Sequence, residues 1–231
     1  MLQFVFSMLS VAQSPAHATS CDGEETSIPK MPSRPVQIDI FNQKMANLPG
    51  PQDVVFVGDS LVQFWPDKSL REAALSPRFF NFGVGLDRTE NLLWRLQAPQ
   101  LPALNPKTAV ILIGANNLRA NNSACAIAAG IEAVAGRVRD IWPKANRILI
   151  QVLPQGDDFS YQNDNRQQTN TLVREYLERS TNVRVLNVDS LITCNFEPSC
   201  PNYLADHLHL SQVGYETLGK VVARAIRTSS R

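Results

Sequence analysis

Histidine is scarce in this chain: 231 residues contain only His17, His207 and His209. So few imidazoles argue against a histidine-rich metal site, and the H-x-H pair at 207 and 209 has no third histidine left to complete one. The same scarcity leaves very few candidates for chemistry that depends on an imidazole.

An excess of charge of either sign is also missing. The sequence has 22 Lys and Arg against 21 Asp and Glu, a formal net charge of +1. Without a basic excess to neutralise phosphates, the composition argues against a nucleic-acid partner. No apolar run is long enough to span a membrane. A hydrophobic content of 44% with 19% charged residues is ordinary for a globular protein and excludes wholesale disorder.

The N-terminus carries a short apolar stretch that ends in Ala16-His17-Ala18, with small residues at positions −3 and −1 of a cleavage site. This pattern predicts a signal peptide over 1–18 and therefore a secreted or periplasmic protein. The stretch has no Lys or Arg ahead of it, so a packed or disordered apolar terminus is the alternative. Residues 19–50 are polar and rich in proline, and we expect an extension with one short helix around 36–47. A single domain is expected over 51–231.

The cysteines are few but even in number: Cys21, Cys125, Cys194 and Cys200. Export would place them in an oxidising compartment. Cys194 and Cys200 flank a turn-prone loop that a disulfide could close, while the pairing of the other two stays open. Neither pair has CxxC spacing, which argues against a zinc site.

From residue 54 onward, short apolar runs alternate with helical patterns. The runs predict five strands, at 54–57, 79–82, 109–113, 147–153 and 183–188. Helical spacing of apolar residues predicts helices at 90–96, 124–142, 172–177 and 213–226. This alternation indicates an α/β fold with a parallel sheet covered on both faces. Because ligands bind beyond the carboxyl ends of such strands, the residues that follow each strand decide function.

Ser60 follows the first predicted strand, in Gly58-Asp59-Ser60. A serine at a strand-to-helix turn can point its hydroxyl into the crevice as a nucleophile, although it can equally be an ordinary helix N-cap.

The turns after the second and third strands carry groups that could stabilise a developing oxyanion. Gly83 and Gly85 permit close backbone approach and free N–H groups. A dinucleotide loop is disfavoured because Arg88 stands where the third glycine would be. After the third strand, Asn116 could donate from its side chain, or cap a helix in an Asx turn with Asn117.

Asp206-His207-Leu208-His209 stands ahead of the last predicted helix. A carboxylate three residues before an imidazole can hydrogen-bond its Nδ1 and leave Nε2 free as a base. Asp206 and His209 therefore form a candidate catalytic pair.

Taken together, these motifs resemble the SGNH (GDSL) hydrolase superfamily. The resemblance runs over about residues 53–228, is carried by the motifs at 55–62, 81–89, 114–117 and 206–210, and is strongest toward platelet-activating factor acetylhydrolase subunits and related bacterial acyl-esterases. It implies a flavodoxin-like three-layer α/β/α sandwich with a central five-stranded parallel sheet. Asn117 stands where the third motif commonly has Asp.

The resemblance also implies the roles of individual residues. Ser60 is the expected nucleophile, His209 the base and Asp206 the carboxylate that orients it. The expected oxyanion donors are the backbone N–H groups of Ser60 and Leu86 and the side chain of Asn116. Leu86 occupies a position where the family has glycine, and a leucine there adds bulk and resists positive φ.

We therefore predict an exported serine esterase that hydrolyses carboxylic esters, with a short acyl group such as acetyl, through an acyl-serine intermediate. No cofactor or metal is implied, and the expected partner is a small-molecule or carbohydrate ester. The alternatives are an O-acyltransferase that acts on a carbohydrate with the same residues, and a catalytically weakened carbohydrate-binding homologue. The alcohol half of the ester and the oligomeric state do not follow from the sequence.

Overall fold

Five short apolar segments form one parallel sheet in the computed structural model, which describes residues 25–178 and 182–229. The strands are β1 (Val54–Gly58), β2 (Phe79–Gly83), β3 (Thr108–Leu112), β4 (Asn146–Ile150) and β5 (Val183–Leu186). Their spatial order is β2-β1-β3-β4-β5, and all neighbouring pairs are parallel. The fold class expected from the sequence is confirmed. The predicted signal peptide over 1–18 and Cys21 lie outside the described residues.

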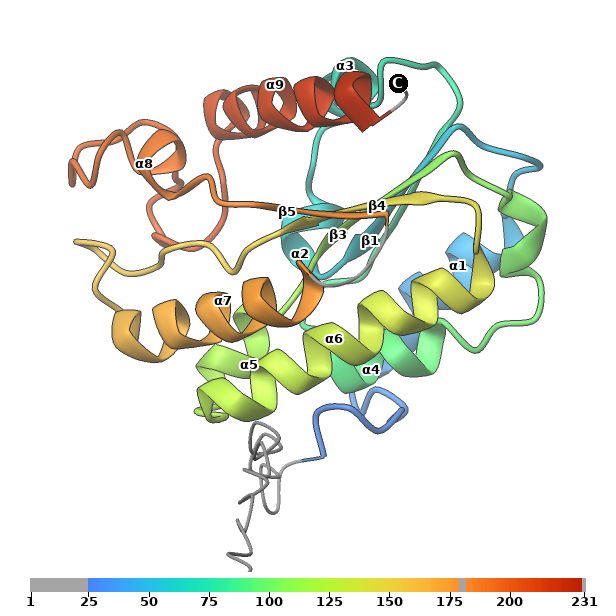
Figure 1. Cartoon of the computed structure of the whole chain (residues 1–231), viewed down its shortest axis with the longest axis horizontal. Helices are drawn as coiled ribbons and strands as arrows, with labels where there is room; N and C mark the ends of the chain where they lie inside the picture. Colours follow the sequence, from blue (N-terminus) through green and yellow to red (C-terminus); the bar gives the residue numbers. More distant parts are fainter. Residues whose placement is uncertain (1–24, 179–181, 230–231) are drawn as a thin grey trace, which may run out of the picture.

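Helices cover both faces of this sheet (Figure 1). The helices are α1 (Pro35–Ala46), α2 (Ser60–Gln63), α3 (Asp67–Ala74), α4 (Thr89–Arg95), α5 (Ala115–Arg119), α6 (Ala124–Ile141), α7 (Asn163–Leu177), α8 (Asp189–Ile192), α9 (Gln212–Ser229) and the 3-10 turn η1 (Leu101–Leu104). Helices α3 and α9 lie over one face, and α1, α4, α6 and α7 lie over the other. Strands β1 and β3 are consequently buried along their whole length.

Apolar spacing explains how the long helices dock. In α6, Ile127, Ile131, Val134 and Val138 recur at helical spacing and are all buried against the sheet. The Ser123 side chain accepts a hydrogen bond from the Ala126 N–H and caps the start of this helix.

Helix α7 begins earlier than the apolar pattern predicts. The sequence suggests a helix from 172 and a polar stretch over 155–170, whereas the helix already starts at Asn163. Its inward face is polar in the first turns: Arg166 is fully buried and donates to the Val152 carbonyl oxygen at 3.0 Å. Buried positions recur at helical spacing in these turns, but polar residues occupy them. A pattern of apolar residues therefore does not indicate this part of the helix.

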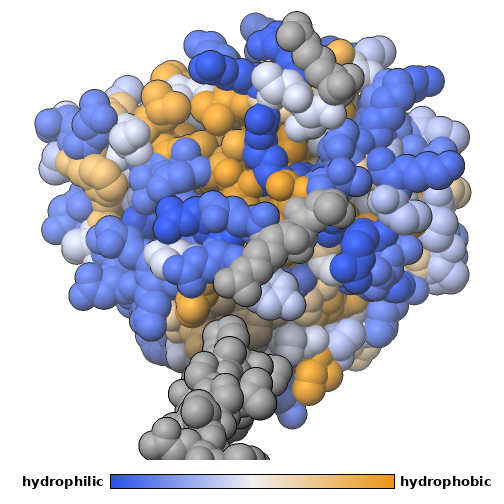
Figure 2. Space-filling view, viewed as in Figure 1, coloured by the Kyte–Doolittle hydropathy of each residue, from blue (hydrophilic) through white to orange (hydrophobic). Residues whose placement is uncertain are grey.

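None of the helices within the described residues is both long and apolar enough to cross a membrane. Polar side chains cover much of the face seen in Figure 2, and the broadest apolar area lies between the positions of α9 and α7. That is where the half-buried edge strand β5 reaches the surface.

Candidate active site

The carboxyl ends of β1, β2 and β3 bring three predicted site segments to one edge of the sheet. Ser60 is the first residue of α2, directly after β1. The N-cap of this helix is Asp59, whose Oδ1 accepts from the Leu61 N–H at 2.9 Å. The alternative in which Ser60 itself is the cap is therefore wrong, and its hydroxyl is available for other contacts.

The Asp206–His209 segment reaches Ser60 from the other end of the chain. It lies in a short loop closed by an antiparallel bridge between Tyr203 and Leu210. His209 Nδ1 is 2.6 Å from Asp206 Oδ2, and His209 Nε2 is 2.9 Å from Ser60 Oγ. The structure thus joins the three residues in one hydrogen-bonded chain across 149 residues of sequence.

Asp206 is tied to this loop by more than the imidazole. Its Oδ1 accepts from the backbone N–H groups of Leu208 at 3.0 Å and His209 at 2.9 Å. Partial burial by itself raises the pKa of Asp206, but the hydrogen bonds from the His209 ring and these two N–H groups outweigh it. The net result is a lowered pKa, which keeps Asp206 ionised and able to orient His209.

His207 does not join this chain of contacts. It has a positive φ of 50°, and its Nε2 lies 3.9 Å from Asp157 Oδ1, the nearest carboxylate oxygen paired with it. The ring of His209 is instead flanked by Phe64, whose centroid lies 5.3 Å away in an edge-on arrangement. Phe64 was not expected from the sequence. It is 53% exposed and forms part of the wall beside the imidazole.

The three predicted oxyanion donors lie on consecutive strand ends. Among the described residues, neither the backbone N–H of Ser60 nor that of Leu86 donates a hydrogen bond. Asn116 Nδ2 donates one hydrogen to the Asp87 carbonyl oxygen at 2.9 Å and has a second hydrogen to offer. Leu86 adopts φ of 67°, a left-handed conformation that strains the backbone of a leucine.

Gln63 holds the turn that carries Leu86, and sequence reasoning missed it. Its Oε1 accepts from the Gly85 N–H, which fixes the peptide next to Leu86. The turn lies so close to α2 that a Cβ on Gly83 would approach the Gln63 backbone nitrogen to 2.3 Å. The only sequence feature that could have indicated this role is spacing. Gln63 follows Ser60 by about one helical turn, which places both on the same side of α2.

A buried ion pair lies behind the same turn. Arg95 and Asp87 are both fully buried and meet at 2.6 Å, and Gln37 of α1 donates to the other Asp87 oxygen at 2.8 Å. Arg95 also donates to the carbonyl oxygens of Phe82 at 2.9 Å and Gly58 at 3.1 Å, the ends of β2 and β1. The pair thus links the two strand ends that carry Ser60 and Leu86.

Asn117 supports the site without facing it. The side chain is fully buried; its Oδ1 accepts from the Thr89 N–H at 2.9 Å and its Nδ2 donates to Glu90 at 3.1 Å. Asn117 therefore fixes the start of α4 and leaves Asn116 as the amide that faces the site.

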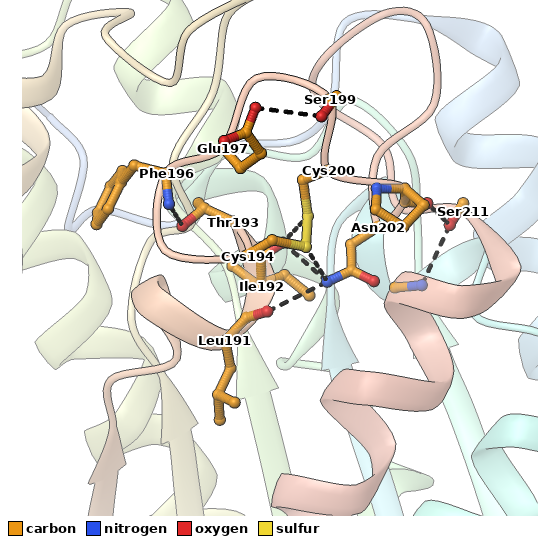
Figure 3. The surroundings of a disulfide bond; sticks show 12 residues. Leu191, Ile192, Thr193, Cys194, Phe196, Glu197, Ser199, Cys200, Asn202 and Ser211 are labelled. Carbon is orange, nitrogen blue, oxygen red and sulfur yellow. Dashed lines mark hydrogen bonds between the residues drawn. A yellow bond between two sulfur atoms is a disulfide. The ribbon is translucent and has the colours of Figure 1, made fainter.

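Cys194 and Cys200 form the disulfide whose loop the sequence picked out, with a Cα–Cα distance of 5.5 Å (Figure 3). Two residues later, Asn202 donates to the carbonyl oxygens of Leu191 at 3.2 Å and Ile192 at 3.1 Å. The disulfide loop therefore packs directly against the segment that leads into Asp206.

Within the described ranges, no group of three or more His, Cys, Asp and Glu side chains is placed to hold a metal ion. The site geometry is that of the serine hydrolases, in which an imidazole bridges a serine hydroxyl and a carboxylate on an α/β scaffold.

Comparison with known proteins identifies the family within that class. The model of the GDSL-like lipase/acylhydrolase family matches residues 56–217. The human platelet-activating factor acetylhydrolase IB subunit alpha2 is 34% identical over 170 residues, which cover 73% of each chain. The rat alpha1 subunit is 32% identical over 164 residues, 71% of this chain and 70% of its own.

Solved structures agree in fold. A lipase/acylhydrolase from Enterococcus faecalis superposes with a TM-score of 0.62 at 24% identity, covering 77% of this chain and 96% of its own. A GDSL-like lipase from Bacteroides thetaiotaomicron gives 0.63 at 17% identity, covering 84% and 98%. The chain belongs to the GDSL-like lipase/acylhydrolase family and is a carboxylic ester hydrolase.

Proposed function

We propose that this hydrolase is a serine esterase in which Ser60 attacks the ester carbonyl carbon while His209 takes the hydroxyl proton. The contact that carries the proposal is the 2.9 Å hydrogen bond between His209 Nε2 and Ser60 Oγ, continued to Asp206 at 2.6 Å. Asp206 holds the imidazole in the tautomer that accepts at Nε2 and stabilises the imidazolium that forms.

The tetrahedral intermediate then needs donors for its oxyanion. The N–H groups of Ser60 and Leu86 and the second hydrogen of Asn116 Nδ2 provide them, and none of the three brings a charge that must be desolvated. His209 next gives its proton to the leaving alcohol, and the acyl group stays on Ser60. Water, deprotonated by the same imidazole, releases the acid and regenerates the serine.

We propose a short acyl group, acetyl being the simplest. Two observations support this choice. Leu86, one of the proposed oxyanion donors, carries an isobutyl side chain where the family resemblance implies glycine. Two relatives of this chain, the human alpha2 and rat alpha1 subunits, are acetylhydrolase subunits by name.

We also propose that the protein acts outside the cytoplasm. The predicted signal peptide over 1–18 and the Cys194–Cys200 disulfide both fit an oxidising compartment. The proposed substrate there is a small-molecule or carbohydrate ester.

Hydrolysis of p-nitrophenyl acetate by the pure protein tests this function. The assay compares the wild type with Ser60→Ala, and Ser190→Ala, which changes an exposed serine in α8, is the control. We expect Ser60→Ala to abolish turnover and labelling by a fluorophosphonate probe, and Ser190→Ala to retain both. Labelling of another residue would overturn the assignment, and failure of the wild type to hydrolyse any ester would favour the binding homologue. Added sugar acceptors that divert the acyl group from water would show an acyltransferase.

A further inference from the structure

A cavity of about 420 Å³ opens next to the proposed oxyanion donors, because both Leu86 and Asn116 line it. Four cationic side chains line it as well: Lys30, Arg34, Arg88 and Arg119. Neither Ser60 nor His209 is among the lining residues. The cavity therefore adjoins two of the proposed oxyanion donors, and its lining does not include the proposed nucleophile or base.

The positive charge of this cavity is only partly balanced. Glu90 is the one carboxylate that lines it, and Arg88 lies 3.4 Å from it. In the described ranges, no carboxylate forms an ion pair with the other three cations. Arg119 stacks over the ring of Tyr161 at 5.6 Å, which leaves its charge in place. All four cationic residues are exposed, and several incompletely compensated cations around a concave surface create a positive potential that attracts anions.

The segment ahead of the family-matched region builds one wall of the cavity. Lys30 and Arg34 precede residue 56, where the family match begins. The backbone N–H of Lys30 donates to the Glu90 carbonyl oxygen at 2.9 Å, and Asn91 Nδ2 donates to the Lys30 carbonyl oxygen at 3.1 Å. Gln37 anchors the next helical turn through its buried hydrogen bond to Asp87. These contacts fix the two cations against the turn that carries Leu86.

We propose that this cavity is a subsite for an anionic group, a carboxylate or a phosphate, carried by the ester substrate a few bonds from the scissile carbonyl. The inference rests on the proposed function, since Leu86 and Asn116 mark the carbonyl position. Guanidinium groups pair with carboxylates and phosphates through two parallel hydrogen bonds, which gives orientation as well as attraction. The N-terminal segment is then part of the specificity machinery of this enzyme.

Paired esters test the subsite, and they tell which half of the ester carries the anion. An aryl monosuccinate compared with the aryl butyrate places a carboxylate on the acyl half. The 4-acetoxybenzoate ion compared with its methyl ester places it on the alcohol half. In one of the two pairs, we expect the anionic member to be favoured in kcat/KM by about tenfold, the effect of about one pKa unit of interaction.

Variants separate this electrostatic preference from differences in leaving-group chemistry. Lys30→Gln/Arg34→Gln should lower the anionic-to-neutral ratio by about tenfold. Arg224→Gln, which removes an exposed cation from α9 on the opposite face of the sheet, should leave the ratio unchanged. Raising NaCl to about 0.5 M should lower the wild-type ratio, because salt screens partly exposed charges. Equal kcat/KM values within both ester pairs would overturn the subsite. So would an equal fall of the anionic-to-neutral ratio in the double variant and in Arg224→Gln.

Binding to Ser60→Ala keeps this test independent of turnover. Calorimetric titration of that variant with each ester should show the same anionic preference, lost when Lys30→Gln/Arg34→Gln is added. If the wild type hydrolyses no ester but this preference is found, the proposed esterase fails and the subsite stands. If neutral and anionic esters bind alike while the neutral ones are hydrolysed, the subsite fails and the esterase stands.

Discussion

Arg95 Nε lies 2.6 Å from Asp87 Oδ2 with both side chains fully buried, directly behind the turn that presents Leu86 to the site. Arg95 also binds the carbonyl oxygens that end β1 and β2. Removing one member of a buried pair leaves the other charge without compensation, whereas an exposed pair is worth little.

Arg95→Met should therefore lower the free energy of unfolding by about 3–5 kcal/mol. Arg78→Met, which breaks the exposed pair with Asp53, is the matched control and should cost much less. Guanidinium unfolding of both variants makes the comparison. Equal losses would show that the buried pair has no special role in joining the two strand ends.

Asp59 should give the protein a pH-dependent stability. Burial, followed by the nearby charge of Asp87, raises the pKa of Asp59 to about 7, and its Oδ2 has no hydrogen-bond partner among the described residues. The fold thus favours the protonated acid, so this contribution is fully present below about pH 4 and is lost as pH rises through about 7.

Asp59→Asn keeps an oxygen for the Leu61 N–H and removes the charge. Unfolding of both proteins at pH 5 and pH 8 should show the variant gaining stability over the wild type at pH 8, by a few kcal/mol. A difference that is the same at both pH values would contradict the raised pKa.

The Cys194–Cys200 disulfide should stabilise the fold and the loop that leads to Asp206. Closing a loop this short contributes about 2 kcal/mol by restricting the unfolded chain. Cys194→Ser/Cys200→Ser should lose that amount, and the wild type in reductant should approach the double variant in guanidinium unfolding. Peptide mapping of exported protein that finds both thiols free would refute the pairing.

The order of the motifs and their positions at strand ends could be predicted because apolar runs and glycines mark the strands clearly. The polar side chains that support the site could not be predicted. From its charge, Arg95 is expected at the surface of a short helix, and Gln37 lies in a segment that the sequence suggests is only an extension. The first turns of helix α7, before residue 172, were missed for the same reason, since the buried Arg166 is not an apolar residue. Buried polar partners depend on tertiary neighbours, which periodicity does not report.

Leu86→Gly should widen the range of acyl chains with little change in acetate turnover. Leu86 has φ of 67° and is 44% exposed, so glycine removes bulk from the cavity wall and little buried area. Relief of left-handed strain and the extra entropy of the unfolded glycine chain nearly cancel, each about 1 kcal/mol.

Leu75→Gly is a close control, because Leu75 also has positive φ, 55°, and is 45% exposed, but lies at the end of α3. Rates for p-nitrophenyl esters of two to eight carbons should broaden only in Leu86→Gly. A large gain in acetate turnover would instead show that Leu86 distorts the oxyanion site.

The two C-terminal histidines give the most decisive comparison. His209 meets Ser60 at 2.9 Å and Asp206 at 2.6 Å, whereas His207 approaches only Asp157, at 3.9 Å. His209→Gln should lose at least about a thousandfold in kcat/KM, the scale seen when a member of such a triad is removed, whereas His207→Gln should keep at least about a tenth. Asp206→Asn should lose less than His209→Gln, because Asp206 orients the imidazole and does not accept the proton. If His207→Gln is the inactive variant, the proposed base is the wrong residue, and the contacts of His209 with Ser60 and Asp206 are structural only.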